Sequence, residues 1–176
     1  PLLPLRRLHD DGGGAVADMG IHAIDTLRFV LGEPTAIAVS ARTDRRFISG
    51  DVEDTASIRI DWESGGWPEV EAGWWQPFAD GPESSLRLYG TTGTATLFPT
   101  GVVKGAGGDS ATTIAGPAVS KVDHCDPIIY AAQIAHMVDV VNGAPSLLDA
   151  CGPAAVAIME AAYRSAASGA TERVPR

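Results

Sequence analysis

The sequence predicts an α+β fold in which a mostly antiparallel, open β-sheet is covered by helices on one face. Two observations lead to this prediction. Apolar residues recur at helical spacing near both ends of the chain, and they alternate with polar residues through its middle. Alternation places one face of each strand on a core and the other face toward water. With 176 residues, the chain is long enough for one domain with a substantial core.

Glycine and proline mark the ends of the three expected helices. The first covers residues 15–31 and is followed by Gly32, the second covers residues 128–141 with Pro127 in its first turn, and the third covers residues 149–168. The third helix is expected to bury one apolar stripe. The apolar stripes are Val16, Met19, Ala23, Leu27 and Val30 in the first helix, and Val156, Met159, Ala162 and Tyr163 in the third.

Strands are expected between the helices, where the apolar period is two. The alternating segments are residues 35–48, 53–62, 67–76, 84–89 and 94–98, with a possible last strand at 171–174. The Gly-Thr-Thr-Gly sequence at 90–93 predicts a hairpin. Residues 101–116 are rich in Gly, Ala, Ser and Thr, and are expected to form a loop or a weak edge strand.

Charge and composition exclude several classes of protein. The net charge is −9, from 22 acidic and 13 basic residues, and basic residues adjoin only at Arg6-Arg7 and Arg45-Arg46, which argues against nucleic-acid binding. No apolar run approaches the ~18 residues of a membrane span, and the first residues lack the pattern of a signal peptide. Cys125 and Cys151 are expected to be reduced thiols rather than a disulfide. We therefore expect a cytoplasmic protein.

Chemistry is concentrated in the first helix. Asp18 and His22 are four residues apart and Asp25 follows three residues later, so a regular helix presents all three on one face. A carboxylate beside an imidazole suits proton transfer near neutral pH. The same spacing also fits an exposed helical pair or a metal site, although no further cluster of His or Cys supports a metal. Asp25 either orients His22 or is a solvated or capping acid.

Three glycines, residues 12–14, precede the helix that carries Asp18, His22 and Asp25. Gly13 and Gly14 either pack closely against another domain, form a flexible lead-in, or let backbone amides approach substrate or cofactor at a positive helix end.

Residues 12–25 (Gly-Gly-Gly-Ala-Val-Ala-Asp-Met-Gly-Ile-His-Ala-Ile-Asp) resemble the opening helix of the C-terminal domain in the Gfo/Idh/MocA oxidoreductases. The resemblance continues through residues 52–56, 88–94 and 161–169. It implies a glyceraldehyde-3-phosphate-dehydrogenase-like C-terminal domain and a sheet whose open face packs on a neighbouring subunit, giving a homo-oligomer. We expect alternating strands with Ile and Trp on them to supply that face.

The resemblance also implies an activity, which is hydride transfer between a sugar or polyol hydroxyl carbon and NAD or NADP. The family's active-site acid and histidine match Asp18 and His22. His22 would take the hydroxyl proton, and Asp18 would hold the substrate hydroxyl and tune the imidazole.

Two features of the family are missing from the sequence: the glycine-rich turn of a Rossmann domain, and a lysine in a Glu-Lys-Pro motif. Residues 1–176 are thus expected to be the substrate-binding and oligomerisation domain of a longer two-domain enzyme, and to be inactive alone. Two alternatives stay open. One is a relative that cleaves glycosidic bonds through redox at the cofactor, and the other is a non-catalytic scaffold or dimerisation domain.

Overall fold

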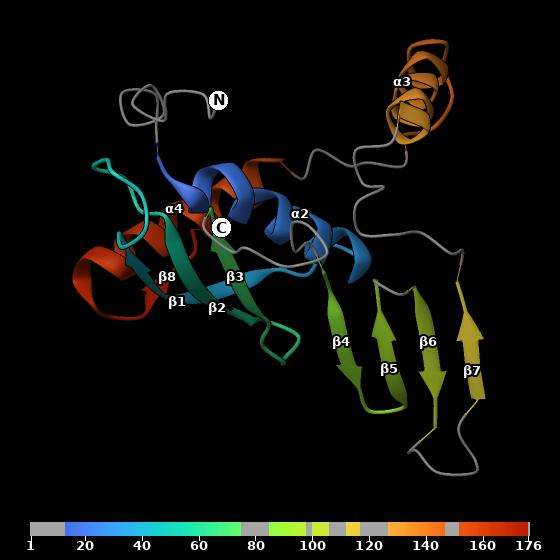
Figure 1. Cartoon of the computed structure of the whole chain (residues 1–176). Helices are drawn as coiled ribbons and strands as arrows, with labels where there is room; N and C mark the ends of the chain where they lie inside the picture. The colour runs from blue at the N-terminus through green and yellow to red at the C-terminus, as the bar shows by residue number, and fades with distance from the viewer. Residues whose placement is uncertain are drawn as a thin grey trace. The chain divides into compact units, whose positions relative to one another are not determined.

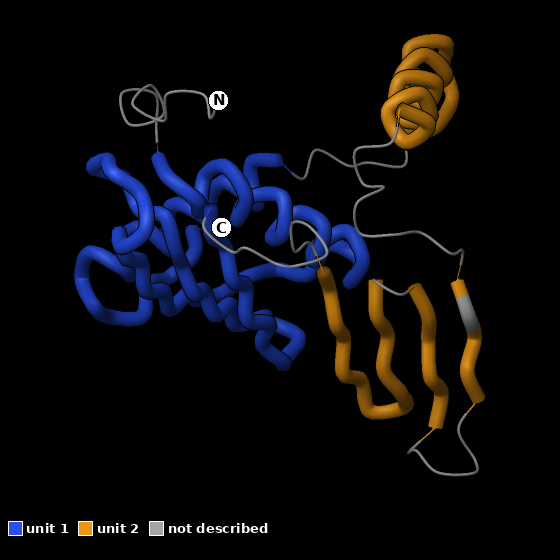
Figure 2. The backbone as a smooth tube through the Cα atoms, in the orientation of Figure 1, with its two compact units in different colours: residues 1–75, 148–176 blue, residues 76–147 orange. Residues whose placement is uncertain are grey.

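The computed structural model describes residues 13–74, 85–97, 100–105, 112–116, 127–146 and 152–175. The chain divides into two compact units, Pro1–Trp75 with Leu148–Arg176, and Gln76–Leu147 (Figure 2). Helices and antiparallel sheets confirm the α+β class. The expectation that residues 1–176 form a single domain of a longer enzyme stays a prediction.

The first unit contains a four-stranded antiparallel sheet with the order β3-β2-β1-β8 (Figure 1). Its strands are β1 Ala36–Asp44, β2 Thr55–Trp62, β3 Glu69–Gly73 and β8 Glu172–Arg173. The last strand therefore pairs with the first, and Ala38 lies opposite Arg173. This pairing places the C-terminal strand at the edge of the sheet, beside β1.

The two faces of this sheet differ in polarity, as the alternation predicts. Ile58 of β2 is fully buried, and it lies opposite Ala41 of β1 and Val70 of β3, which are also buried. Ser57 and Arg59, the neighbours of Ile58, are exposed on the other face. One face thus forms the core, and the other is polar.

Three helical segments cover the apolar face: η1 Val16–Gly20, α2 Ile21–Val30 and α4 Gly152–Ser168. The segment η1 packs on β2 and β3, α4 packs on β1, and α2 packs against α4. The expected helix at 15–31 is therefore present, but it begins as a π-helix in which the Ile21 N–H donates to the Val16 carbonyl. Single π-turns occur often at functional sites, and the apolar spacing alone did not reveal this one.

The stripe predicted for α4 is wrong in part. Of the four residues named, only Ala162 is among the buried residues of the helix, and Val156 is 41% exposed. Small side chains face β1 instead, because they let the helix lie close to the sheet. The buried residues of α4 are Ala155, Ile158, Ala161, Ala162 and Ser165.

Ser165 shows how close that packing is. Its hydroxyl accepts a hydrogen bond from the Ala41 N–H at 2.9 Å and donates to the Ala170 carbonyl at 2.6 Å.

In the first helix, Val16 and Leu27 are buried as the stripe suggests, whereas Met19 is 42% exposed. Ile24, which the stripe omitted, is fully buried.

The second unit contains a second antiparallel sheet with the order β4-β5-β6-β7. Its strands are β4 Arg87–Gly90, β5 Gly93–Thr96, β6 Gly101–Lys104 and β7 Thr112–Ala115. Gly90 lies opposite Gly93, which confirms the hairpin. Residues 101–116 were expected to form a loop or one weak edge strand, but Gly101–Lys104 and Thr112–Ala115 within them form two paired strands. Valine, threonine and isoleucine favour strands there despite the flanking glycines.

Helix α3 Pro127–Val141 confirms the expected second helix, with proline at its first position. None of its side chains is buried within the described chain. Ile128 and Val141, near its two ends, are 76% and 74% exposed although both are apolar. In the described ranges, no helix combines the length and apolar character needed to cross a bilayer.

The open face of the first sheet differs from the expectation for an oligomer interface. Ile58, Ile60 and Trp62 lie on the face that the helices cover, because they belong to the buried residues of β2. An apolar row crosses the second sheet instead, and its members are Leu88, Ala95, Val102 and Ile114, which lie opposite one another on successive strands. Val102 and Ile114 are exposed. Oligomerisation stays a prediction, and the exposed apolar residues that could support it lie on the second sheet.

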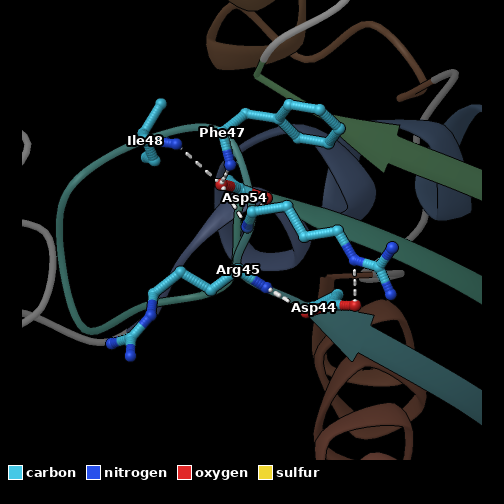
Figure 3. A network of polar contacts seen from close by, with 6 residues as sticks. Asp44, Arg45, Phe47, Ile48 and Asp54 are labelled. Carbon is cyan, nitrogen blue, oxygen red and sulfur yellow. Dashed lines mark hydrogen bonds and ion pairs between the residues drawn. The ribbon is translucent and has the colours of Figure 1, made fainter.

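The loop between β1 and β2 is organised by one carboxylate. Asp54 is 0% exposed, and it accepts hydrogen bonds from the backbone N–H groups of Arg46, Phe47 and Ile48 at 3.0, 2.7 and 2.9 Å (Figure 3). Burial raises the pKa of Asp54, but the three N–H donors outweigh it, so the pKa lies below its ordinary value. The charged form is therefore the one that fits the loop.

We expect Asp54→Asn to lower the free energy of unfolding at neutral pH by about 1–3 kcal/mol, because an amide cannot serve three N–H donors as a carboxylate does. The pKa of Asp54 is lower in the folded chain than in the unfolded one. Its contribution is therefore complete above the unfolded pKa and is lost as the pH falls through the folded pKa. The difference between wild type and variant should shrink below about pH 4.

Urea denaturation at a series of pH values measures this difference. The control is Asp61→Asn, which removes an ion pair with Arg59 on the exposed face of the sheet and should cost much less. Equal losses in the two variants would show that Asp54 does not anchor the loop.

Candidate active site

Asp18 and His22 both lie on the exposed side of the first helix. Asp18 belongs to the π-turn η1, and His22 is the second residue of α2. Asp25 follows one turn further along α2 and is half-buried. The carboxylate and imidazole are thus presented to solvent from a helical segment that is itself packed on the sheet.

Glu53 fixes the start of that segment. Its Oε1 atom accepts hydrogen bonds from the N–H groups of Gly14 and Val16 at 3.1 and 3.0 Å, and from the Tyr163 hydroxyl at 2.8 Å. The Glu53 backbone carbonyl accepts a further bond from the Ala15 N–H at 2.9 Å. The N–H groups at a helix start otherwise need water or a capping side chain as acceptor. The Glu53 carboxylate, two residues before β2 begins, serves as that cap.

The two glycines are required by this arrangement. A Cβ atom on Gly14 would lie 2.1 Å from the Glu53 carbonyl oxygen, where no side chain fits. Gly13 has a φ of 131°, and a Cβ atom there would lie 2.5 Å from the Tyr163 hydroxyl oxygen. Their close approach is thus to groups of this chain. An approach to substrate or cofactor stays a prediction.

Tyr163 connects the site to α4. Burial raises the pKa of its hydroxyl, and the neighbouring Glu53 carboxylate raises it further, so the phenol stays protonated and donates to Glu53. The sequence placed Tyr163 in a buried stripe but did not suggest a partner for its hydroxyl.

Trp74 contacts Asp18 directly. Trp74 directly follows β3, and its indole N–H donates a hydrogen bond to Asp18 Oδ2 at 2.8 Å. Nothing in the local sequence pattern links these two residues, which are 56 positions apart.

The contacts expected around His22 are absent from the described chain, where no hydrogen bond joins it to Asp18 or Asp25. The catalytic roles of Asp18 and His22, and the orienting role of Asp25, stay predictions. Among the described residues, no group of three or more His, Cys, Asp or Glu side chains could hold a metal. Cys125 and Cys151 lie outside those residues.

One hollow on the first unit does not involve the predicted site residues. It is lined by residues of the polar sheet face and the end of α4, including Ser40, Arg59 and Thr171, and by none of the predicted site residues. Asp18 and His22 are both exposed, and neither lines this hollow.

Comparison with known proteins identifies the family. The model of the GFO/IDH/MocA C-terminal domain matches residues 4–96, just over half of the chain. The chain belongs to this family of oxidoreductases, and it corresponds to the C-terminal domain.

Particular relatives are similar over most of the chain. D-apiose dehydrogenase from Rhizobium rhizogenes is 28% identical over an alignment of 172 residues, and the match covers 89% of this chain and 47% of the relative. The solved structure of GenD2 from gentamicin A biosynthesis, in complex with NAD, is 28% identical with a TM-score of 0.72, and the match covers 94% of this chain and 49% of GenD2.

An oxidoreductase from Agrobacterium radiobacter, solved with NAD⁺, L-tartaric acid and magnesium, is also 28% identical, with a TM-score of 0.71 and coverage of 90% and 48% of the two chains. Levoglucosan dehydrogenase, at 19% identity and a TM-score of 0.75, shares the fold. The chain spans about half the length of the relatives it matches.

We expect Gly14→Ala to lower the free energy of unfolding by about 1–3 kcal/mol, because the new methyl group would displace the Glu53 carbonyl. Thermal or urea denaturation measures the loss. Gly50→Ala is the control, since a Cβ atom there meets nothing within 4 Å. A Gly14→Ala variant as stable as the Gly50→Ala variant would contradict the close approach.

Tyr163→Phe should lower the free energy of unfolding by about 1.5–3 kcal/mol, because it removes the hydroxyl that donates to the charged Glu53 carboxylate while keeping the ring. Faster hydrogen exchange at the Val16 amide, which shares that acceptor, should accompany the loss. The matched control is Tyr130→Phe, where the ring is 51% exposed on α3. Unchanged exchange at Val16 would mean that the phenol does not help to hold the helix start.

Proposed function

We propose that this chain is the substrate-binding and oligomerisation domain of an NAD- or NADP-dependent dehydrogenase that acts on a hydroxyl group of a sugar or polyol. The observation that carries the proposal is the exposed Asp18 and His22 pair on a firmly held helix start, in a chain of this family. The relatives named as dehydrogenases, and those solved with NAD or NADH, support the same class of reaction.

Oxidation of an alcohol separates a proton from the hydroxyl oxygen and a hydride from the carbon. His22 is the residue that accepts the proton, since a neutral imidazole is a good base near pH 7. Asp18 accepts a hydrogen bond from the substrate hydroxyl and so orients it toward His22. Both groups are exposed, and each is therefore open to a substrate at the surface.

The residues present fit the hydroxyl side of this reaction. They include one base and one hydrogen-bond acceptor, and the described residues contain no glycine-rich strand–turn–helix that would hold a pyrophosphate. The nicotinamide cofactor supplies the hydride acceptor when bound. Its nucleotide would be held by a dinucleotide-binding domain, and that domain would also enclose the open surface around His22.

Asp25 lies on α2 one turn beyond His22 and is half-buried. We assign it the supporting role of orienting the imidazole. The apolar row of the second sheet, Leu88, Ala95, Val102 and Ile114, is the surface we assign to contact with another subunit. Apolar side chains exposed in such a row are typical of a covered interface.

The test joins this chain to the dinucleotide-binding half of a relative, or uses the complete enzyme. We expect His22→Ala to lower kcat for NAD(P)-dependent alcohol oxidation by about 10²–10⁴-fold, because the proton acceptor is lost. The measurement is the rate at which reduced cofactor forms, detected by its absorbance. His136→Ala, which changes a histidine of α3, is the control.

Near-normal kcat in the His22→Ala enzyme would contradict the catalytic assignment. Cleavage of a glycoside without net formation of reduced cofactor would favour the redox-neutral alternative. Absence of any turnover in the complete wild-type enzyme, over a panel of sugars and polyols, would favour the scaffold.

A further inference from the structure

The contact between Trp74 and Asp18 joins a strand to the predicted catalytic helix. The indole N–H reaches Asp18 Oδ2 at 2.8 Å, and Asp18 is otherwise exposed. An exposed aspartate side chain with no partner samples several rotamers, which weakens any reaction that needs its carboxylate in one place. This hydrogen bond removes that freedom from one carboxylate oxygen.

Two features place Trp74 against η1. The strand β3 lies directly on η1, since a Cβ atom added to Gly20 would be only 3.5 Å from the Ala72 side chain. Alternation along the strand puts Trp74 on the same side as Ala72. In addition, the Trp74 N–H donates to the Asp54 carbonyl at 3.1 Å, which extends the pairing of β3 with β2 by one residue. The backbone of Trp74 is thus held before its side chain reaches Asp18.

The chemistry of indole suits this contact. An indole N–H is a donor only, so it can fix a carboxylate oxygen without competing as an acceptor for a substrate hydroxyl and without exchanging a proton with the reacting groups. Asp18 Oδ1 is left free of this bond. A carboxylate held by one oxygen still offers the other to a ligand.

We propose that Trp74 is a positioning residue, which holds Asp18 by Oδ2 so that Oδ1 accepts the substrate hydroxyl. The proposal rests on the proposed function of Asp18. It adds to the site a residue that comes from the sheet, 56 positions away from Asp18 in the sequence.

Kinetics of the complete enzyme test the proposal with a double-mutant cycle. Trp74→Phe keeps an aromatic ring and removes the N–H, and it should lower kcat/KM by roughly tenfold or more, a typical effect of losing a hydrogen bond to a charged group. In an Asp18→Asn background the same change should have little further effect, because the contact is already weakened. Trp74→His keeps a ring N–H and should restore part of the loss.

The control is Trp67→Phe, which changes an exposed tryptophan in the turn between β2 and β3 and should leave kcat/KM unchanged. Additive losses from Trp74→Phe and Asp18→Asn would overturn the proposal. So would a Trp74→Phe enzyme with wild-type kcat/KM.

A second measurement on the chain itself needs no turnover. The indole N–H resonance of Trp74, assigned by triple-resonance experiments on the wild-type chain, should shift in Asp18→Asn and exchange faster with solvent, whereas the Trp67 resonance should not. Persistence of the Trp74 resonance and its exchange rate in Asp18→Asn would overturn the contact, including where Trp74→Phe fails to fold.

The two proposals fail in different ways. If His22→Ala keeps its turnover, the proposed function is wrong, although the indole resonance still reports the Asp18 contact. If His22→Ala abolishes turnover while the Trp74 and Asp18 variants are additive, the proposed function stands and the positioning role is wrong.

Discussion

The Glu53 carboxylate gathers three donors onto one oxygen: the backbone N–H groups of Gly14 and Val16 and the hydroxyl of Tyr163. These donors come from the start of η1 and from α4, near opposite ends of the chain, while Glu53 itself directly precedes Asp54 and β2. The same oxygen therefore ties the first helix, the sheet and the last helix together. Asp54, the next residue, uses its own carboxylate to hold the loop after β1. Two adjacent acids thus organise the part of the first unit that presents Asp18 and His22.

A firm helix start matters for the proposed chemistry. Asp18 and His22 are exposed, so burial does not hold their side chains, and their positions depend on the backbone beneath them and, for Asp18, on the hydrogen bond from Trp74. That backbone is anchored by Glu53 on one side and packed on β2 and β3 on the other. The site is consequently rigid at its base and open at its surface. This arrangement suits a half-site that is completed by a second domain carrying the cofactor.

Several elements could be predicted because their signals are local. Pro127 opens α3, the Gly-Thr-Thr-Gly sequence closes the hairpin of β4 and β5, and alternation along β2 separates buried Ile58 from exposed Arg59. The failures arose where packing decided. Ala155 and Ser165 are buried in α4 while the larger Val156 is exposed, since a helix lying close on β1 needs small side chains there. Gly101–Lys104 and Thr112–Ala115 form strands because neighbouring strands supply their hydrogen bonds.

For the candidate site, the residue types and their spacing in the sequence were sufficient to single out Asp18 and His22 and to place them on a helix. The sequence also determined the α+β class, since helical and alternating periods are properties of neighbouring residues. Only the tertiary structure showed that Glu53 and Tyr163 hold the helix start and that Trp74 reaches Asp18. Those contacts join residues between 37 and 110 positions apart. Such pairs leave no periodic trace in one sequence, because the fold alone decides which distant side chains meet.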